Sequence, residues 1–239
     1  MSEIAQQKLA EAKVIVLGVG GIGCACATYL AEAGVGSVVM VDPANVLETE
    51  LPEQFLFKLE DVGLPKVEVA KRRLKAMNPE IEVLGLRQTF DAHNAERILD
   101  DGDVIADALG NWQGKMLASD VCMRFKKTLI HAGVRAFEFQ VYTMIPGKSA
   151  CLRCVFANLG LDDVHASHSG HGVLGPVAGM AGAFQAIEAI KVITGIGTTP
   201  GSYLIRFDAL RRYFDDVSEL LPRPDCPDCG MPFELPEEY

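Results

Sequence analysis

The sequence predicts an α/β fold: a Rossmann-like, mostly parallel sheet with helices on both faces, extended by antiparallel strands and a zinc-stapled C-terminal tail. First, an apolar run at 14–17 leads into closely spaced glycines and an Ala-rich helical segment at 24–33. Second, strand and helix patterns alternate from residue 14 to residue 132, which is typical of parallel strands joined by right-handed crossovers. Third, two Cys-x-x-Cys pairs lie in the second half of the chain.

The glycine-rich stretch predicts a nucleotide site. Its glycines are Gly18, Gly20, Gly21 and Gly23. They allow a tight turn and close approach to a phosphate, at which the next helix points its free N–H groups and positive dipole end. A second apolar run, 37–41, ends in Asp42, where such folds place the acid that binds a ribose hydroxyl. A glycine turn without a ligand is the alternative.

The other elements complete a single domain, 1–239, with a nucleotide-binding half (1–132) and a substrate and zinc half (133–239). Residues 43–57 form an acidic, irregular crossing segment. Helices are expected at 2–12, 66–77, 95–99, 115–125 and 176–194. Strands are expected at 81–86, 103–107, 128–132, 138–145 (antiparallel) and 202–208. The small residues of the last helix suggest close packing or a subunit contact.

Composition narrows the function classes. The 239 residues are 49% hydrophobic and 23% charged, which is ordinary for a globular protein. The net charge of −10 argues against nonspecific binding to nucleic acid or anionic membranes. No apolar run approaches the roughly 20 residues that span a bilayer, and the N-terminus lacks the pattern of a secretory signal. Seven cysteines in an α/β pattern favour a reducing cytoplasm.

The cysteine pairs predict a metal site. They are Cys151 with Cys154, and Cys226 with Cys229. Two such turns complete a closed tetrahedral zinc site with no open position, so the predicted role is structural. A redox dithiol or unligated thiols are the alternatives. The other cysteines, Cys24, Cys26 and Cys122, are expected to be small buried hydrophobes.

Several stretches resemble the ThiF/MoeB/HesA family, relatives of the ubiquitin-activating enzymes. They run in family order over nearly the whole chain. The matching stretches are 16–24, 33–37, 63–70, Asn78-Pro79, 151–154, 172–176, 184–191 and the final Cys-Pro-Asp-Cys-Gly.

The resemblance implies an enzyme that uses MgATP to adenylate a carboxylate. The usual substrate is the C-terminal glycine of a small ubiquitin-like sulfur-carrier protein, although some members adenylate peptides or small molecules. A carboxylate is a poor electrophile until AMP becomes its leaving group, so the enzyme must position two anions and neutralise phosphate charge. The resemblance also implies a homodimer, or a heterodimer with a competent homologue.

Residue by residue, the resemblance implies that the four glycines cradle the nucleotide and that Asp42 holds the ribose. Lys66 meets the phosphates and is the first catalytic candidate, and Gln54 matches the glutamine of the family's crossing segment. Asn111 completes the cofactor-binding set. Lys115 is a second catalytic candidate, which could touch phosphate or cap a solvated helix.

The sequence departs from the family where the chemistry is expected. Glu50 and Glu53 stand where the family carries Asn and Arg, and Glu53 would repel triphosphate oxygens. Gly110 replaces an aspartate that helps bind metal and ATP. His168 falls at or near the position of the acceptor cysteine. The family also supplies an arginine before the first strand, whereas the first arginine here is Arg72.

A tryptophan and a group of three histidines each have more than one interpretation. Trp112 could stack on a base or close the pocket by packing. His165, His168 and His171 could bind a metal or act as acid–base groups, or they could be solvated loop histidines.

Three functions follow from these features. The first is an ATP-dependent adenylyltransferase that passes its acyl-adenylate directly to a nucleophile. The second is a degenerate nucleotide-binding protein that acts as a partner or regulatory subunit. The third is an NAD-binding protein, because a carboxylate at Asp42 suits a free ribose 2′-hydroxyl.

Overall fold

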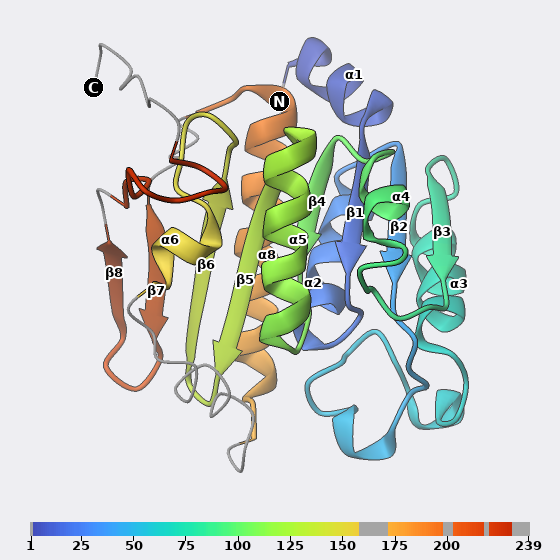
Figure 1. Cartoon of the computed structure of the whole chain (residues 1–239). Coiled ribbons are helices and arrows are strands. Elements are labelled where there is room, and N and C mark those ends of the chain that lie inside the picture. The colour runs from blue at the N-terminus through green and yellow to red at the C-terminus, as the bar shows by residue number, and fades with distance from the viewer. Residues whose placement is uncertain (1, 158–171, 198–202, 218–219, 231–239) are drawn as a thin grey trace.

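The computed structural model describes residues 2–157, 172–197, 203–217 and 220–230, and one sheet runs through it (Figure 1). The strand order is β3-β2-β1-β4-β5-β6-β7-β8. The strands are β1 (Lys13–Leu17), β2 (Ser37–Val41), β3 (Glu82–Leu86), β4 (Val104–Asp107), β5 (Thr128–Arg135), β6 (Glu138–Met144), β7 (Leu204–Asp208) and β8 (Tyr213–Val217). Strands β1 to β5 pair in parallel, and β5 to β8 pair antiparallel. The predicted parallel sheet with an antiparallel extension is therefore confirmed.

Helices cover both faces of the sheet, as predicted. Figure 1 shows α4 and α5 on one face, with α2, α3 and α8 on the other. Each face has its own hydrophobic core. The helices are α1 (Glu3–Glu11), α2 (Gly21–Glu32), α3 (Lys66–Met77), α4 (Ala95–Leu99), α5 (Trp112–Phe125), α6 (Leu152–Val155) and α8 (Gly175–Thr194). Two 3₁₀ turns, η1 (Glu48–Glu50) and η2 (Leu59–Asp61), lie in the crossing segment.

The strand order determines where a ligand can bind. From β1 the chain crosses to β2 on one side, and β4 returns on the other side of β1. The helices that follow β1 and β4, α2 and α5, therefore lie on opposite faces of the sheet (Figure 1). Open parallel sheets bind ligands at this switch point.

Helix α8 packs closely against α2. A Cβ atom on Gly182 would lie 2.2 Å from the carbonyl oxygen of Ile22, so only glycine permits this approach. By length and composition α8 is the one helix in the described part of the chain that could cross a membrane, which differs from the expectation that no such run exists. Half of it is buried here, and its Glu188 accepts a hydrogen bond from Thr143 and pairs with Lys191. These contacts are those of a core helix.

The element boundaries differ from the predictions in a few places. Helix α5 begins at Trp112 rather than at Lys115, and β5 continues to Arg135 because its last residues form a hairpin with β6. Strand β8 and the short helix α6 were not predicted. The three-histidine segment lies outside the described residues.

Candidate functional site

The glycine loop joins β1 to α2 at the switch point. Gly18 has a positive φ of 90°, and a Cβ atom there would lie 2.7 Å from the carbonyl oxygen of Ala108. A Cβ atom on Gly23 would lie 2.0 Å from the carbonyl oxygen of Gly18. The N-cap of α2 is Gly20, and no side chain caps the helix. The first amides of α2 are thus left for an anionic ligand.

Asp42 follows β2 and holds the glycine loop from the side. Its two carboxylate oxygens accept hydrogen bonds from the backbone amides of Val19 and Ala44, each at 2.8 Å. A carboxylate oxygen can accept more than one hydrogen bond, so this arrangement leaves acceptor capacity beside the loop. The contact of Asp42 with a ribose stays a prediction.

The crossing segment lies over the glycine loop. A Cβ atom on Gly21 would be 3.1 Å from the carbonyl oxygen of Glu53, and one on Gly20 would be 3.9 Å from Nε2 of Gln54. Gln54 is 3% exposed, and its Oε1 has no hydrogen-bond partner among the described residues. A buried acceptor without a partner is costly, which suits a position where a ligand donates a hydrogen bond.

A buried acid fastens this segment to α3. Asp61 accepts a hydrogen bond from the amide of Lys58 at 2.8 Å and pairs with Arg72 at 2.9 Å and with Arg73. Arg73 also donates to the carbonyl oxygen of Leu56. The sequence did not predict this anchor, because an acid eleven residues before a helical arginine forms no recognisable motif.

Lys66 is the first residue of α3, and its side chain is 5% exposed. Its ammonium pairs with the Glu50 carboxylate at 2.7 Å. The charges of this ion pair also act on Glu53. Burial and the nearby Glu50 raise the pKa of the Glu53 carboxyl, whereas Lys66 lowers it. The predicted phosphate-binding lysine and the two unexpected glutamates therefore share one subsite.

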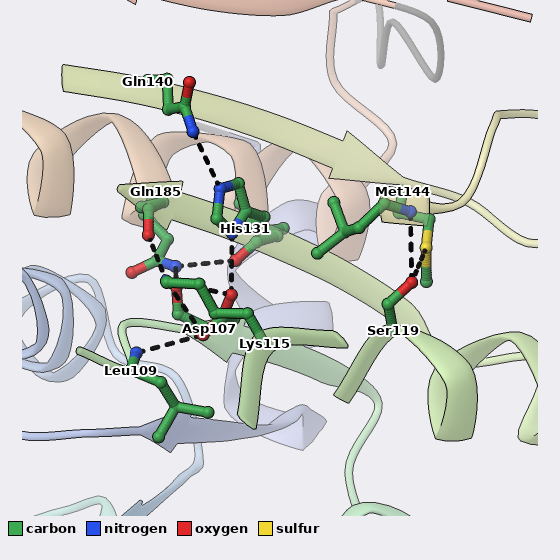
Figure 2. A network of polar contacts seen from close by, with 11 residues as sticks. Asp107, Leu109, Lys115, Ser119, His131, Gln140, Met144 and Gln185 are labelled. Atoms are coloured by element: carbon green, nitrogen blue, oxygen red, sulfur yellow. Dashed lines mark hydrogen bonds and ion pairs between the residues drawn. The ribbon is translucent and has the colours of Figure 1, made fainter. Parts of the chain in front are cut away.

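A buried charge network holds the end of β4 (Figure 2). The Lys115 ammonium lies 3.2 Å from a carboxylate oxygen of Asp107 and donates to the carbonyl oxygen of Ala132 at 2.7 Å. Nδ1 of His131 is 2.8 Å from Asp107. Because Lys115 is 5% exposed, the alternative that it caps a solvated helix is wrong, and its contact with phosphate stays a prediction. Its ammonium is held by Asp107, the residue before Ala108, which touches the glycine loop.

His131 is fully buried between the network and an aromatic cluster. Its ring stacks on Trp112 with centroids 5.7 Å apart and meets Phe156 edge-on at 5.5 Å. This agrees with the packing alternative for Trp112. Burial and the Lys115 ammonium lower the pKa of His131, although Asp107 opposes them. A neutral imidazole that donates its Nδ1–H to Asp107 fits this geometry.

We expect His131 to make the stability of the protein fall on mild acidification. The unfolded chain takes up a proton near pH 6.5, whereas folded His131, with its lowered pKa, does not. The free energy of unfolding should therefore decrease below that pH, with a slope approaching about 1.4 kcal/mol per pH unit. Urea unfolding between pH 7 and 5 measures this slope.

His131→Gln should flatten the slope, and His93→Gln, at an exposed position, should leave it unchanged. An equally steep slope in His131→Gln would contradict the expectation.

Asn111 has a structural partner in addition to any ligand. It is the N-cap of α5, and its side-chain oxygen accepts a hydrogen bond from the amide of Gly114 at 2.8 Å. Such a cap stabilises a helix by roughly 1 kcal/mol. Its role in cofactor binding stays a prediction.

The structure brings the four predicted zinc ligands together. Their sulfur atoms all lie within 4.8 Å of one another, and all four cysteines are free of disulfides. The Cys151–Cys226 and Cys154–Cys229 sulfur pairs are 3.7 and 3.5 Å apart. Tetrahedral zinc with bonds of about 2.3 Å requires sulfur separations of about 3.8 Å. The donor set and its spacing therefore fit structural zinc.

A parallel sheet with an uncapped glycine loop at its switch point and a four-cysteine cluster defines a class: an α/β nucleotide-binding fold with a candidate structural metal centre. The model described as the ThiF family matches residues 1–228. The chain belongs to the ThiF family.

Individual relatives cover nearly the whole chain. Protein HesA of Nostoc sp. is 33% identical over 234 residues, which cover 95% of this chain and 88% of HesA. The sulfur carrier protein adenylyltransferase of Thermus thermophilus is 34% identical over 230 residues, which cover 94% of this chain and 84% of that protein. The crystal structure of E. coli MccB with ATP matches with a TM-score of 0.84 at 26% identity, covering 95% of this chain and 69% of MccB.

Proposed function

We propose that this protein is an ATP-dependent adenylyltransferase that activates a carboxylate as an acyl-adenylate. The observation that carries the proposal is the uncapped N-terminus of α2 at the switch point of the sheet, covered by the crossing segment whose Glu50 pairs with Lys66. The names of the relatives support it, because one is a sulfur carrier protein adenylyltransferase and MccB has been crystallised with ATP and with MccA. The substrate class is the C-terminus of a small ubiquitin-like or sulfur-carrier protein, a peptide or a small carboxylic acid.

In this reaction a substrate carboxylate oxygen attacks the α-phosphorus of ATP, and pyrophosphate leaves. The α2 amides and Lys66 stabilise the negative charge on the phosphates, and the glycines allow the backbone to approach them. Gln54 and Asp42 supply acceptors for donors on the nucleoside. No acceptor cysteine is assigned, so the acyl-adenylate passes directly to a nucleophile.

The metal requirements differ in kind. Mg²⁺ enters with ATP, because this ion is usually held by one or two carboxylates together with the phosphates of the substrate. Zinc in the four-cysteine cluster has a structural role. We also propose that the protein is a cytoplasmic homodimer, as the family resemblance implies, with α8 contributing to the contact through exposed Ile187.

Exchange of labelled pyrophosphate into ATP tests the proposal. Exchange should appear only with the correct carboxylate, offered as a panel of carrier proteins, peptides and small acids. Lys66→Ala should lower the exchange rate by roughly 100-fold, since removing one charge-stabilising donor costs about this much. Lys71→Ala, at an exposed position of the same helix, should leave it unchanged. Binding of MgATP without exchange for any carboxylate would overturn the proposal.

A second candidate is a non-catalytic partner or regulatory subunit, possessing the fold but not the reaction. The Glu50–Lys66 ion pair favours it, because the site supplies its own anion to the expected phosphate-binding lysine. The NAD-binding alternative rests on Asp42 alone. Calorimetric titration with NAD and MgATP in parallel tests the NAD-binding alternative, and pyrophosphate exchange separates the partner or regulatory subunit from the enzyme.

A further inference from the structure

The Glu50–Lys66 ion pair has no role in the proposed reaction. Lys66 has no second hydrogen-bond or ion-pair partner for its ammonium among the described residues. Glu50 belongs to the crossing segment that lies over the glycine loop, where the carbonyl oxygen of Glu53 would be 3.1 Å from a Cβ atom on Gly21. The carboxylate of Glu50 therefore neutralises a nearly buried cation beside the segment that covers the glycine loop.

The backbone of Glu50 is fixed, but its side chain has freedom to leave. Its carbonyl oxygen accepts hydrogen bonds from the amides of Glu53 and Gln54, both at 3.1 Å. The segment is also anchored further along by Asp61. The carboxylate oxygen that meets Lys66 is buried, but the Glu50 side chain as a whole is 31% exposed, so a rotation can carry it toward solvent without breaking these backbone contacts.

Charge balance shows what such a release requires. Glu50, Glu53 and Lys66 together carry one net negative charge when all are ionised. A polyphosphate that approaches Lys66 must displace Glu50, since two anions cannot both neutralise one nearly buried ammonium. A ligand without phosphate meets no such competition.

We propose that Glu50 is a specificity-determining residue that competes with the ligand's phosphate groups for Lys66. The inference rests on the proposed function for the identity of the ligand, a nucleoside phosphate. The triphosphate of ATP should therefore add less binding affinity, relative to adenosine, than the α2 amides and Lys66 would give without Glu50. The ion pair also holds Lys66 in place while the site is empty.

Calorimetric titration of adenosine, AMP and MgATP tests this on the full chain. Glu50→Gln keeps the size of the side chain but removes its charge, and should bind MgATP about tenfold tighter or more. Its affinity for adenosine should stay within about twofold of the wild type. Glu48→Gln is the matched control, because it removes the same charge from an exposed position of the same 3₁₀ turn and should change neither affinity.

Two further variants separate direct competition from a general loss of negative charge. In a Lys66→Met background, Glu50→Gln should give no gain in MgATP affinity, because the group competed for is absent. Glu50→Ala should reproduce the gain, which guards against a folding defect specific to glutamine.

Equal MgATP affinities of wild type and both Glu50 variants, or no MgATP binding by any of them, would overturn the inference. A gain that persists without Lys66 would also overturn it. If only the proposed function is wrong, MgATP still binds and Glu50→Gln still binds it tighter, but no carboxylate supports pyrophosphate exchange.

Discussion

Asp107→Ala should lower the free energy of unfolding by roughly 3–5 kcal/mol. The carboxylate is fully buried and compensates Lys115, which is also buried, while it orients His131. Burial opposes ionisation, but Lys115 and His131 hold the pKa of Asp107 below its ordinary value. Its stabilising effect is thus present above the ordinary carboxyl pKa and is lost as the pH falls through the lowered one. The variant would leave an ammonium in the core without its counter-ion.

Urea unfolding at pH 7 measures the loss. Asp101→Ala removes an exposed partner of Lys13 and should cost less than about 1 kcal/mol. Replacing both members of the buried pair, Asp107→Ala with Lys115→Met, should recover part of the loss because no unpaired charge remains. If Asp107→Ala cost no more than Asp101→Ala, the network would not be stabilising.

Loss of the four-cysteine centre should have the second large effect. We expect one zinc ion per chain by elemental analysis of the wild type, and its loss in Cys154→Ser and Cys226→Ser. Structural zinc sites contribute on the order of 10 kcal/mol of binding free energy, which becomes folding free energy for the segments they join. Chelation should therefore lower Tm strongly and raise hydrogen exchange first in α6 and residues 220–230.

Cys24→Ala is the matched control for zinc content. Cys24 is fully buried but belongs to the other core, next to the glycine loop. The variant should lose stability through packing and keep its zinc. Full zinc content in Cys154→Ser, or unchanged exchange in the tail after chelation, would contradict a structural tetrathiolate centre.

The sequence predicted the fold well where local patterns were unambiguous. The buried apolar runs at 14–17 and 37–41 form strands as predicted, and Asn78-Pro79 ends α3 at Met77 as expected. Strand β8 was missed because its sequence, Tyr-Phe-Asp-Asp-Val, shows no alternation of apolar and polar residues, and its Tyr213 and Phe214 are exposed. Its pairing with β7, a tertiary contact, decides its conformation.

The site was predicted only in part, because sequence motifs reveal backbone geometry better than charge pairing. The glycines and the cysteines have fixed spacings that identify them. The Asp107–Lys115–His131 network joins residues of three elements, so no spacing along the sequence predicts it. For the same reason, Glu50 could be seen as an unexpected charge, but not as the partner of Lys66.

The separation of the two cysteine pairs along the chain has a consequence for biosynthesis. Cys151 and Cys226 are 75 residues apart, and ribosomes add roughly 5–20 residues per second. For about 4–15 s the first pair is thus translated while the second pair does not yet exist. A chain that stops within this interval has only two of the four thiols that the metal centre requires. Zinc capture therefore distinguishes a finished chain from a truncated one.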